Sequence, residues 1–298
     1  MPDPHWTLDD LRREIDEIDD EIHDLLMRRT KLVEAIGALK KSDGVPAIRP
    51  GREAKILRRL MGRHDGKFPR AQLVRIWREL LSGTTRLQVD FAVAVHVPEE
   101  APGLWDIARD HYGSFTPMTA FGTASQVLRA VTEGGASVGV LPLPQEGDAD
   151  PWWPHLVSVD PQTPRVIARL PFGLPGNARA GVLQALAIGR GAPEATGADL
   201  SLLVIDTSSE ISRTRLFSVL KSGGLEPNFL AAAAGPDAAA NLIEFEGLIS
   251  PEAAPLQKAL VPLGSAVGRI SFLGSYARPL TAEEMAGTAR KPSARKRS

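Results

Sequence analysis

The stretch LDDLRREIDEIDDEIHDLLMRRTKLVEAIGALKK, residues 8–41, decides the fold of the first part of this chain. Its apolar residues recur at spacings of three and four, the pattern of a long helix that packs on other helices. These residues are Leu8, Leu11, Ile15, Ile18, Ile22, Leu25, Leu32, Ile36 and Leu39. Arg29 breaks the pattern, because it occupies the step between Leu25 and Leu32 where another apolar residue is expected.

Two cations share this face of the predicted helix. A guanidinium in a helical core needs an anionic partner, because a buried unpaired charge is costly. Lys40 follows Arg29 by eleven residues, which at about 100° per residue returns it to nearly the same face, about 16 Å along the axis. No internal acid is evident opposite the two cations, which indicates that the missing anion is a ligand.

Composition excludes several classes of function. The 298 residues suffice for two or three domains, and a net charge of −1 with 5% aromatic residues gives no case for a nucleic-acid partner. The absence of cysteine excludes disulfides and thiol catalysis. The start MPDPHWTLDD lacks an apolar signal segment and no apolar run approaches about 18 residues, so we expect a cytoplasmic protein without a membrane partner. Six histidines without metal-ligand spacing predict no metal site: His5, His23, His64, His96, His111 and His155.

The chain is predicted to be multidomain. Residues 1–88 predict three helices: one from Thr7 to the break at residues 42–44, one over residues 52–62 after Pro50, and one from Pro69 towards Gln88. A helix of that first length cannot bury its stripe alone, so we expect an all-α intertwined helical dimer domain. Residues 89–197 alternate strand-like and helical runs and predict a truncated α/β domain. Residues 198–280 predict strand, helix, strand, strand, helix, strand, a ferredoxin-like α/β sandwich. Residues 281–298 predict a disordered basic tail.

Residues 8–88 resemble the all-α chorismate mutase domain, in the form fused to prephenate dehydratases. The resemblance rests on the first stretch, on IRPGREAKILRRL and on VRIWRELLSGTTRLQ, residues 48–60 and 74–88. It implies a cofactor-independent site for chorismate formed by Arg29, Lys40, Arg52, Glu53, Thr84 and Gln88 of one subunit, with Arg12 supplied by the partner of a homodimer. One position departs from the family, which often has an acid near residue 49, whereas this chain has Arg49-Pro50-Gly51.

The chemistry of the residues agrees with that resemblance. Chorismate carries two carboxylates, which suit the bidentate fork of arginine. Its rearrangement to prephenate is a unimolecular pericyclic step, which needs positioning and electrostatic stabilisation and no nucleophile, metal or cofactor. Lys40 and Gln88 are expected to donate to the ether oxygen, and Glu53 to accept from the hydroxyl. Arg12 and Arg29 are 17 residues apart, about 26 Å along one helix, so one small substrate cannot contact both within one chain.

Residues 89–197 resemble the first lobe of a prephenate dehydratase, without its polar motifs. Leu143-Pro144-Gln145 replaces Glu-Asn-Ser and leaves only Glu146-Gly147, and residues 97–102 hold no Thr or Ser where the family has GPxGTFS. Leu183-Gln184-Ala185 replaces the catalytic Thr-Arg-Phe. Because only 40 residues separate Gly147 from Ile188, we expect no second lobe, no candidate for acid catalysis and a non-catalytic remnant.

Residues 198–280 resemble an ACT regulatory domain whose phenylalanine-binding motifs are poorly kept. Residues 213–216 stand for Gly-Ala-Leu, and residues 233–236, Ala-Ala-Gly-Pro, stand for Glu-Ser-Arg-Pro. The sequence therefore predicts a homodimeric chorismate mutase of phenylalanine and tyrosine biosynthesis with an ACT-like domain of structural role. Two alternatives stay open: a bifunctional chorismate mutase–prephenate dehydratase, and a non-catalytic regulatory partner of another aromatic-pathway enzyme.

Overall fold

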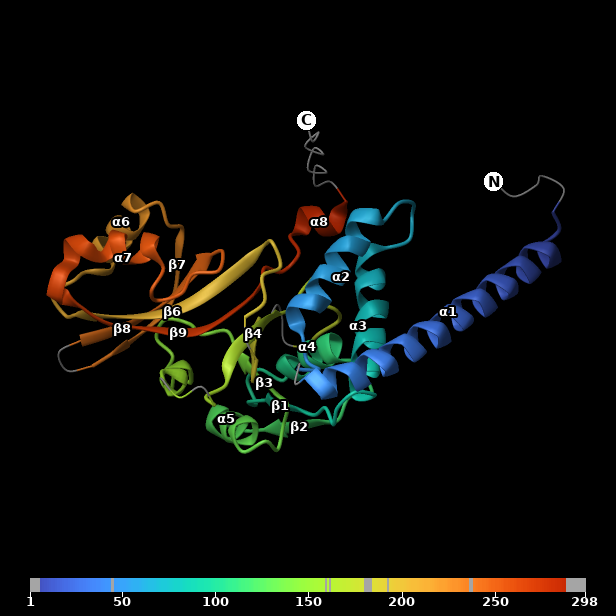
Figure 1. Ribbon diagram of the computed structural model, residues 1–298, viewed down its shortest axis with the longest axis horizontal. Coiled ribbons are helices and arrows are strands. Elements are labelled where there is room, and N and C mark those ends of the chain that lie inside the picture. Colours follow the sequence, from blue (N-terminus) through green and yellow to red (C-terminus); the bar gives the residue numbers. More distant parts are fainter. Residues whose placement is uncertain are drawn as a thin grey trace. The chain divides into compact units, whose positions relative to one another are not determined.

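The computed structural model describes residues 6–43, 46–158, 160, 162–179, 184–191, 193–235 and 238–287 (Figure 1). The chain divides into two compact units. The first comprises Met1–Ala47 and Thr84–Asp90, and the second comprises Ile48–Gly83 and Phe91–Ser298.

The three predicted helices of the N-terminal region are confirmed. They are α1 (Leu8–Asp43), α2 (Pro50–Arg63) and α3 (Arg70–Arg86). The first turn of α1 is closed by Thr7, whose hydroxyl accepts from the Asp10 backbone N–H at 3.2 Å, while the Asp10 carboxylate accepts from the Thr7 backbone N–H at 3.0 Å. This reciprocal pair is the capping arrangement that Thr-x-x-acid sequences favour.

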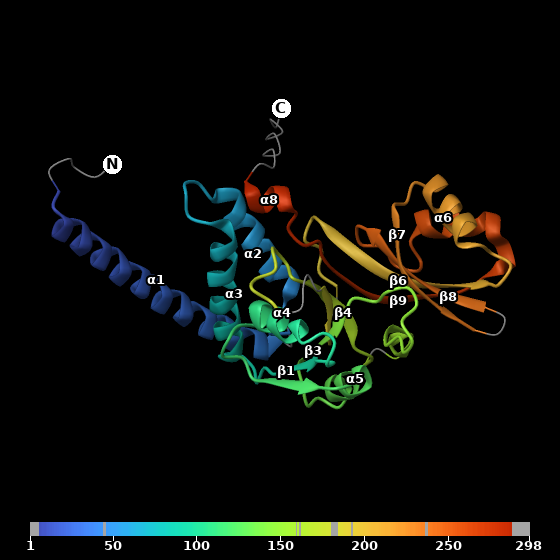
Figure 2. The same ribbon diagram turned by 180° about the vertical axis from the view of Figure 1, so that it is seen from behind.

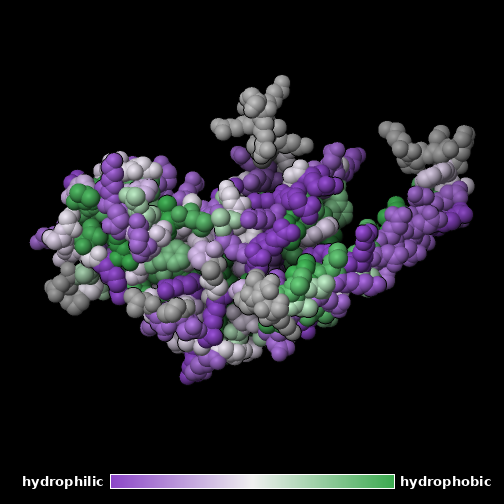
Figure 3. Space-filling view, in the orientation of Figure 1, coloured by the Kyte–Doolittle hydropathy of each residue, from purple (hydrophilic) through white to green (hydrophobic). Residues whose placement is uncertain are grey.

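The apolar stripe of α1 is exposed in the single chain. Ile22 is 50% exposed, Leu32 60% and Leu39 65%, and most other members of the stripe are similarly open. The face of α1 visible in Figure 3 is mostly hydrophilic, as expected of an amphipathic helix seen from its polar side. A stripe of this length needs a covering surface, and the single chain leaves most of it uncovered.

A nine-stranded mixed sheet forms the second unit, in the order β2-β1-β3-β5-β4-β9-β6-β8-β7. Its first half holds β1 (Val93–His96), β2 (Met118–Phe121), β3 (Val138–Pro142), β4 (Arg165–Leu170) and β5 (Ala185–Gly189). The strands β2, β1 and β3 run parallel, and β5 is antiparallel to both β3 and β4. Two helices connect the parallel strands, α4 (Gly103–Tyr112) and α5 (Ala124–Thr132).

The second half of the sheet has the element order predicted for residues 198–280. It holds β6 (Asp199–Ser208), α6 (Arg213–Ser222), β7 (Pro227–Ala234), β8 (Ala238–Glu246), α7 (Ala254–Leu260), the short 3-10 helix η2 (Val261–Ala266) and β9 (Val267–Ala277). The strands pair as β9-β6-β8-β7, all antiparallel, with α6 and α7 on one face (Figure 2). This order is that of a ferredoxin-like sandwich.

Both faces of β6 are buried, because the side chains of a strand alternate between its two faces. Leu203 and Ile205 pack with α6 and α7, whereas Leu202 and Val204 belong to a second core that also includes Trp152. The two halves of the sheet join where Val166 of β4 pairs with Gly274 of β9. A Cβ atom at Gly274 would collide with the Val166 backbone, so the junction requires glycine there.

Between β3 and β6, the described residues contain no α-helix; they form the 3-10 helix η1 (Trp153–Leu156), β4 and β5. The expectation of a disordered tail from residue 281 was wrong for its first residues. Thr281 caps α8 (Ala282–Ala286) through a reciprocal pair with Glu284, and Met285 is buried. Short helices of this kind depend on caps and tertiary packing, which composition does not reveal. Residues 288–298 lie outside the described part of the chain.

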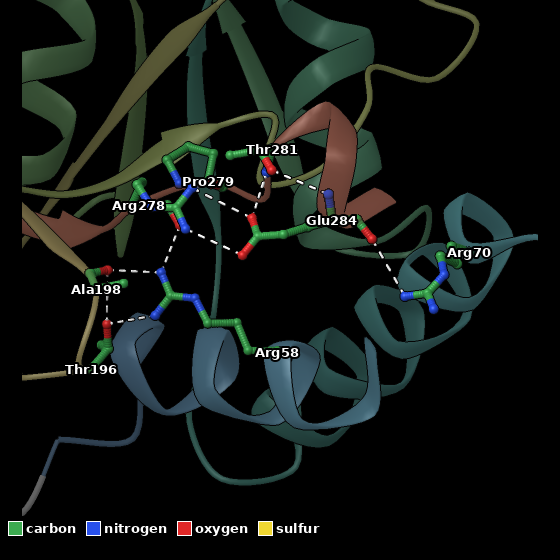
Figure 4. A network of polar contacts seen from close by, with 8 residues as sticks. All are labelled: Arg58, Arg70, Thr196, Ala198, Arg278, Pro279, Thr281 and Glu284. Carbon is green, nitrogen blue, oxygen red and sulfur yellow. Dashed lines mark hydrogen bonds and ion pairs between the residues drawn. The ribbon is translucent and has the colours of Figure 1, made fainter. Parts of the chain in front are cut away.

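Within the second unit, the helix α2 packs against the end of β9 and the loop after β4. Ala54, Leu57 and Met61 of α2 are buried with Phe172 and Leu280. Figure 4 shows the polar part of the same contact, which centres on Arg58. Its guanidinium donates to Thr196 Oγ1 at 2.8 Å, to the Ala198 carbonyl at 2.8 Å and to the Arg278 carbonyl at 2.7 Å.

Candidate active site

Arg29 and Thr84 meet inside the first unit. The Arg29 side chain is half-buried, and its Nη1 donates to Thr84 Oγ1 at 3.4 Å. Burial lowers the pKa of Arg29, which shows that the guanidinium has lost part of its hydration. No carboxylate among the described residues forms an ion pair with Arg29. The site is therefore prepared for an anion that the described part of the chain does not supply.

Lys40 and Gln88 form the next contact along α1. Lys40 Nζ donates to Gln88 Oε1 at 3.3 Å and to the Ala47 carbonyl at 3.4 Å, and Gln88 Nε2 donates to the Thr84 carbonyl at 3.2 Å. A Cβ atom at Gly37 would lie 3.0 Å from Gln88 Cγ, so the glycine leaves room for this side chain against α1. Gly37 is thus a positioning residue that the sequence pattern did not single out.

Four of the predicted site residues therefore gather in one unit. Arg29 and Lys40 come from α1, Thr84 from the last turns of α3, and Gln88 from the residues just after it. Together they present two cations and two hydrogen-bonding groups.

The first turn of α2 carries Arg52 and Glu53 in the second unit. The turn has no side-chain cap of its own. Glu194 supplies one from the loop after β5, because its carboxylate accepts from the Arg52 backbone N–H at 3.2 Å and from Arg49 Nε at 2.5 Å. A Cβ atom at Gly51 would come within 2.8 Å of Glu194, which explains the glycine. The family often has an acid near position 49, and the hydrogen bond of Arg49 to Glu194, the residue that caps α2, thus accounts for the arginine found here.

Glu53 forms an ion pair that sequence analysis did not predict. Its Oε2 accepts from Arg78 Nη1 at 2.8 Å, and Arg78 is only 4% exposed. The signal for Arg78 was available, because it interrupts an apolar face of α3 between the buried residues Val74 and Leu81. It is the same misfit that marked Arg29.

Arg12 does not join the other predicted residues of α1. Its side chain is 66% exposed and pairs only with Asp9, at 3.3 Å, among the described residues. The 17 residues between Arg12 and Arg29 correspond to about 26 Å along a straight helix. Arg12 can serve the site only if another subunit supplies it.

A cavity of about 690 Å³ opens at the ends of β1 and β3. Its polar lining residues are His96, Glu100, Gln145, Asp148, Asp150 and Gln184. These carboxylates are exposed and come from loops outside the aligned motifs, and the expectation that this region has no candidate for acid catalysis stays a prediction. Burial lowers the pKa of His96, whose Nδ1 has no partner among the described residues. Leu183, at the position of the family's catalytic threonine, lies outside the described residues.

Glu146, the acid kept from the dehydratase motif, pairs with Arg213 at the start of α6. The Arg213 guanidinium lies 3.9 Å from the centre of the Phe229 ring. The hydrogen bond that Arg213 donates to Glu146 lowers the pKa of the Glu146 carboxyl. Ala233 and Ala234, at the predicted effector motif, end β7 and offer only methyl groups.

No group of metal-binding side chains is present among the described residues. The described helices also include none with the length and apolar character that a membrane span needs.

Comparison with known proteins finds a family match in the helical region. Residues 11–89 match the family chorismate mutase type II. A bifunctional chorismate mutase/prephenate dehydratase from Aquifex aeolicus is 34% identical over 140 residues, which cover 46% of this chain and 38% of that protein. A second one, from Stutzerimonas stutzeri, is 28% identical over 140 residues, with 45% of this chain and 38% of that protein covered. The chain thus spans about two-fifths of the length of these curated relatives.

Among solved structures, the prephenate dehydratase of Streptococcus mutans aligns with a TM-score of 0.45 and 12% identity, covering 62% of this chain and 97% of that one. At this level the structural likeness carries no argument about activity.

Proposed function

We propose that this chain, which carries a chorismate mutase type II domain over residues 11–89, rearranges chorismate to prephenate. The observation that carries the proposal is the half-buried Arg29, which has no ion pair with a described carboxylate and lies on the same helix as Lys40, the residue that donates to Gln88. A dicarboxylate supplies the missing anion. The rearrangement then needs only a compact substrate conformer and donors at the ether oxygen, which this set of side chains offers.

Each side chain has a role in this proposal. Arg29 binds a carboxylate of the substrate, with Thr84 fixing the guanidinium, and Arg52 assists from α2. Lys40 and Gln88 donate to the ether oxygen, where negative charge develops in the transition state. Glu53 accepts from the substrate hydroxyl. No cofactor or metal takes part in these roles.

Chorismate depletion by the purified full chain tests the proposal. Arg29→Ala and Lys40→Ala should each cost about 3–4 kcal/mol of transition-state stabilisation, comparable to the loss of an oxyanion donor. Lys31→Ala is the matched control, because Lys31 is exposed and about 200° around α1 from Arg29. Turnover within tenfold of the wild type in both site variants would contradict the assignment. An inactive wild type would favour a non-catalytic regulatory partner.

We further propose that two chains form an intertwined homodimer through α1. The exposed stripe of α1 supports this, since a second copy of the same stripe would cover it. An antiparallel partner helix would also bring its Arg12 to the Arg29 site.

We also propose that residues 89–197 form a dehydratase-like region and that residues 198–280 form an ACT-like domain. We propose that the first is non-catalytic and that the second responds weakly, if at all, to phenylalanine. The loss of three dehydratase motifs supports a non-catalytic region. Ala233 and Ala234 support a weak response to phenylalanine, because their methyl groups cannot form hydrogen bonds with a zwitterion that leaves water.

The second candidate function is a bifunctional chorismate mutase–prephenate dehydratase. The names of the curated relatives and the carboxylates that line the cavity at the ends of β1 and β3 favour it. Expulsion of the substrate hydroxyl from prephenate requires a positioned acid. If the region is non-catalytic, as we propose, prephenate given to the purified chain should yield phenylpyruvate no faster than an enzyme-free blank. A faster rate that disappears in Glu146→Ala or Asp148→Asn would establish the bifunctional enzyme.

A further inference from the structure

Arg78 lies in a buried cluster made by four separate parts of the second unit. It comes from α3 and donates to Glu53 of α2 at 2.8 Å. The centre of the Phe172 ring, in the loop after β4, lies 5.2 Å from its guanidinium carbon. The helix α4 adds His111 and Tyr112, which are 7% exposed each. Residues of the α/β region therefore enclose a cation that pairs with a residue of the helical region.

Arg78 and Glu53 are the charged pair of this cluster. Burial lowers the pKa of His111 well below its usual value, and burial also raises the pKa of Tyr112, so both are neutral near pH 7. Further charges near the cluster are those of Arg75, which pairs with Glu79 and Asp110, and of Arg58, whose guanidinium carbon lies 5.8 Å from the centre of the Phe172 ring. A buried guanidinium with a single carboxylate partner fixes that carboxylate strongly, because separation would leave an unpaired charge.

Arg78 is too enclosed to contact a substrate, since only 5% of its side chain is exposed. Glu53 is different, because 22% of its side chain remains open. The phenyl ring of Phe172 covers the guanidinium and excludes water, which strengthens the ion pair. Arg78 is thus the buried and rigidly held member of the ion pair, whereas Glu53 reaches solvent.

We propose that Arg78 is a positioning residue that fixes the Glu53 carboxylate for the substrate hydroxyl, and that Phe172 and α4 hold Arg78 in place. This inference rests on the proposed mutase function. It gives the α/β region a part in the mutase reaction: its loop after β4 and its helix α4 build the wall behind a substrate-binding residue. That role is independent of any dehydratase activity of the region.

A double-mutant cycle on the full chain tests this proposal. The four proteins are the wild type, Arg78→Met, Glu53→Gln and the double variant, with Arg59→Met as the control for loss of an exposed arginine on α2. Arg78→Met should lower kcat/KM for chorismate at least about tenfold when Glu53 is present, but less than about twofold in the Glu53→Gln background. The loss should appear mainly as a raised KM, because hydroxyl recognition is weakened. Arg78→Lys, which keeps the charge, should recover at least about half of the loss in log units.

Several outcomes would overturn the proposal. Equal losses of kcat/KM in both backgrounds, or a lower kcat at unchanged KM, would mean that Arg78 only maintains the fold. If Arg78→Met does not fold, as judged by circular dichroism and thermal unfolding, the cycle is run with Arg78→Lys and the same comparison decides. A wild-type chain without chorismate turnover would instead refute the proposed function, and that measurement precedes all variants.

Discussion

Burial holds His111 in its neutral form, and this makes the fold sensitive to acid. The side chain is 7% exposed and its ring packs edge-on against Tyr112, 4.7 Å between centres. Burial, reinforced by the charge of Arg78, lowers the pKa of His111 well below its usual value. An unfolded chain takes up this proton below about pH 6.5 while the folded chain does not, so stability is present above that pH and falls as the pH decreases.

The prediction concerns the free energy of unfolding between pH 6 and pH 5. The free energy of unfolding of the wild type should decrease by about 1 kcal/mol more over that interval than that of His111→Phe, because the variant lacks the titration of one buried imidazole. Urea unfolding at pH 7, 6 and 5 measures it. His96, whose pKa burial also lowers, is present in both proteins and cancels. The control His23→Gln, an exposed residue of α1, should leave the slope unchanged, and equal slopes for His111→Phe and wild type would contradict the account.

Single residues also show which parts of the candidate site were predictable. Arg29 could be recognised because a cation in a regular apolar stripe violates the pattern of one helix. The contacts of Glu53 with Arg78, and of Glu194 with the first turn of α2, join residues 25 and 142 positions apart in the chain. Periodicity carries no information about such pairs, so the buried partner of Glu53 and the cap of α2 required the structure.

At the scale of elements, Arg58 ties α2 to Ala198 and Arg278, the residues that flank the strands β6 and β9. Its guanidinium satisfies the carbonyls of Ala198 and Arg278 (Figure 4). Arg58→Met should lower the free energy of unfolding by about 1–3 kcal/mol, because it leaves the partly buried Arg278 carbonyl without its donor and removes one of the donors to the Ala198 carbonyl. Urea denaturation of the variant measures the effect. Arg59→Met, one position along α2 and exposed, should change stability by less than about 0.5 kcal/mol, and a similar loss in both variants would refute the anchoring role.

Helices and strands differ in how far the sequence specified them. The three N-terminal helices and the order of elements over residues 198–280 follow from apolar periodicity, and the structure has them. The strand β2 gives little signal in the sequence, because Met118–Phe121 is a short edge strand with partly exposed side chains and no alternation. The helix α8 was missed because it depends on the Thr281 cap and on the burial of Met285.

At the scale of the whole molecule, composition suggested separate domains for residues 89–197 and 198–280, whereas their strands share one sheet. The junction is the pairing of β4 with β9 at Val166 and Gly274. Pairing between strands so distant in sequence leaves no local signal, although Gly274 is the residue that permits it.

The proposed dimer gives the last prediction, which concerns complementation between two inactive chains. Arg12→Ala and Arg29→Ala should each be nearly inactive. In a heterodimer of the two, one site keeps Arg29 of one chain and Arg12 of the other, while the second site has neither. A heterodimer purified through two different tags should therefore show about half of the wild-type turnover of chorismate, as the two-fold symmetry of the dimer requires.

A matched pair separates this sharing from general stabilisation. Arg29→Ala combined with Lys40→Ala places one defect in each site, because both residues come from α1 of the same chain. This second heterodimer should stay inactive. Recovery in both heterodimers would mean that Arg12 is not donated across subunits, and so would purified Arg12→Ala/Arg29→Ala heterodimers without turnover. If the wild-type chain sediments as a monomer at assay concentration, the proposed dimer is refuted. The exposed apolar stripe of α1 would then not be covered by a second copy of the chain.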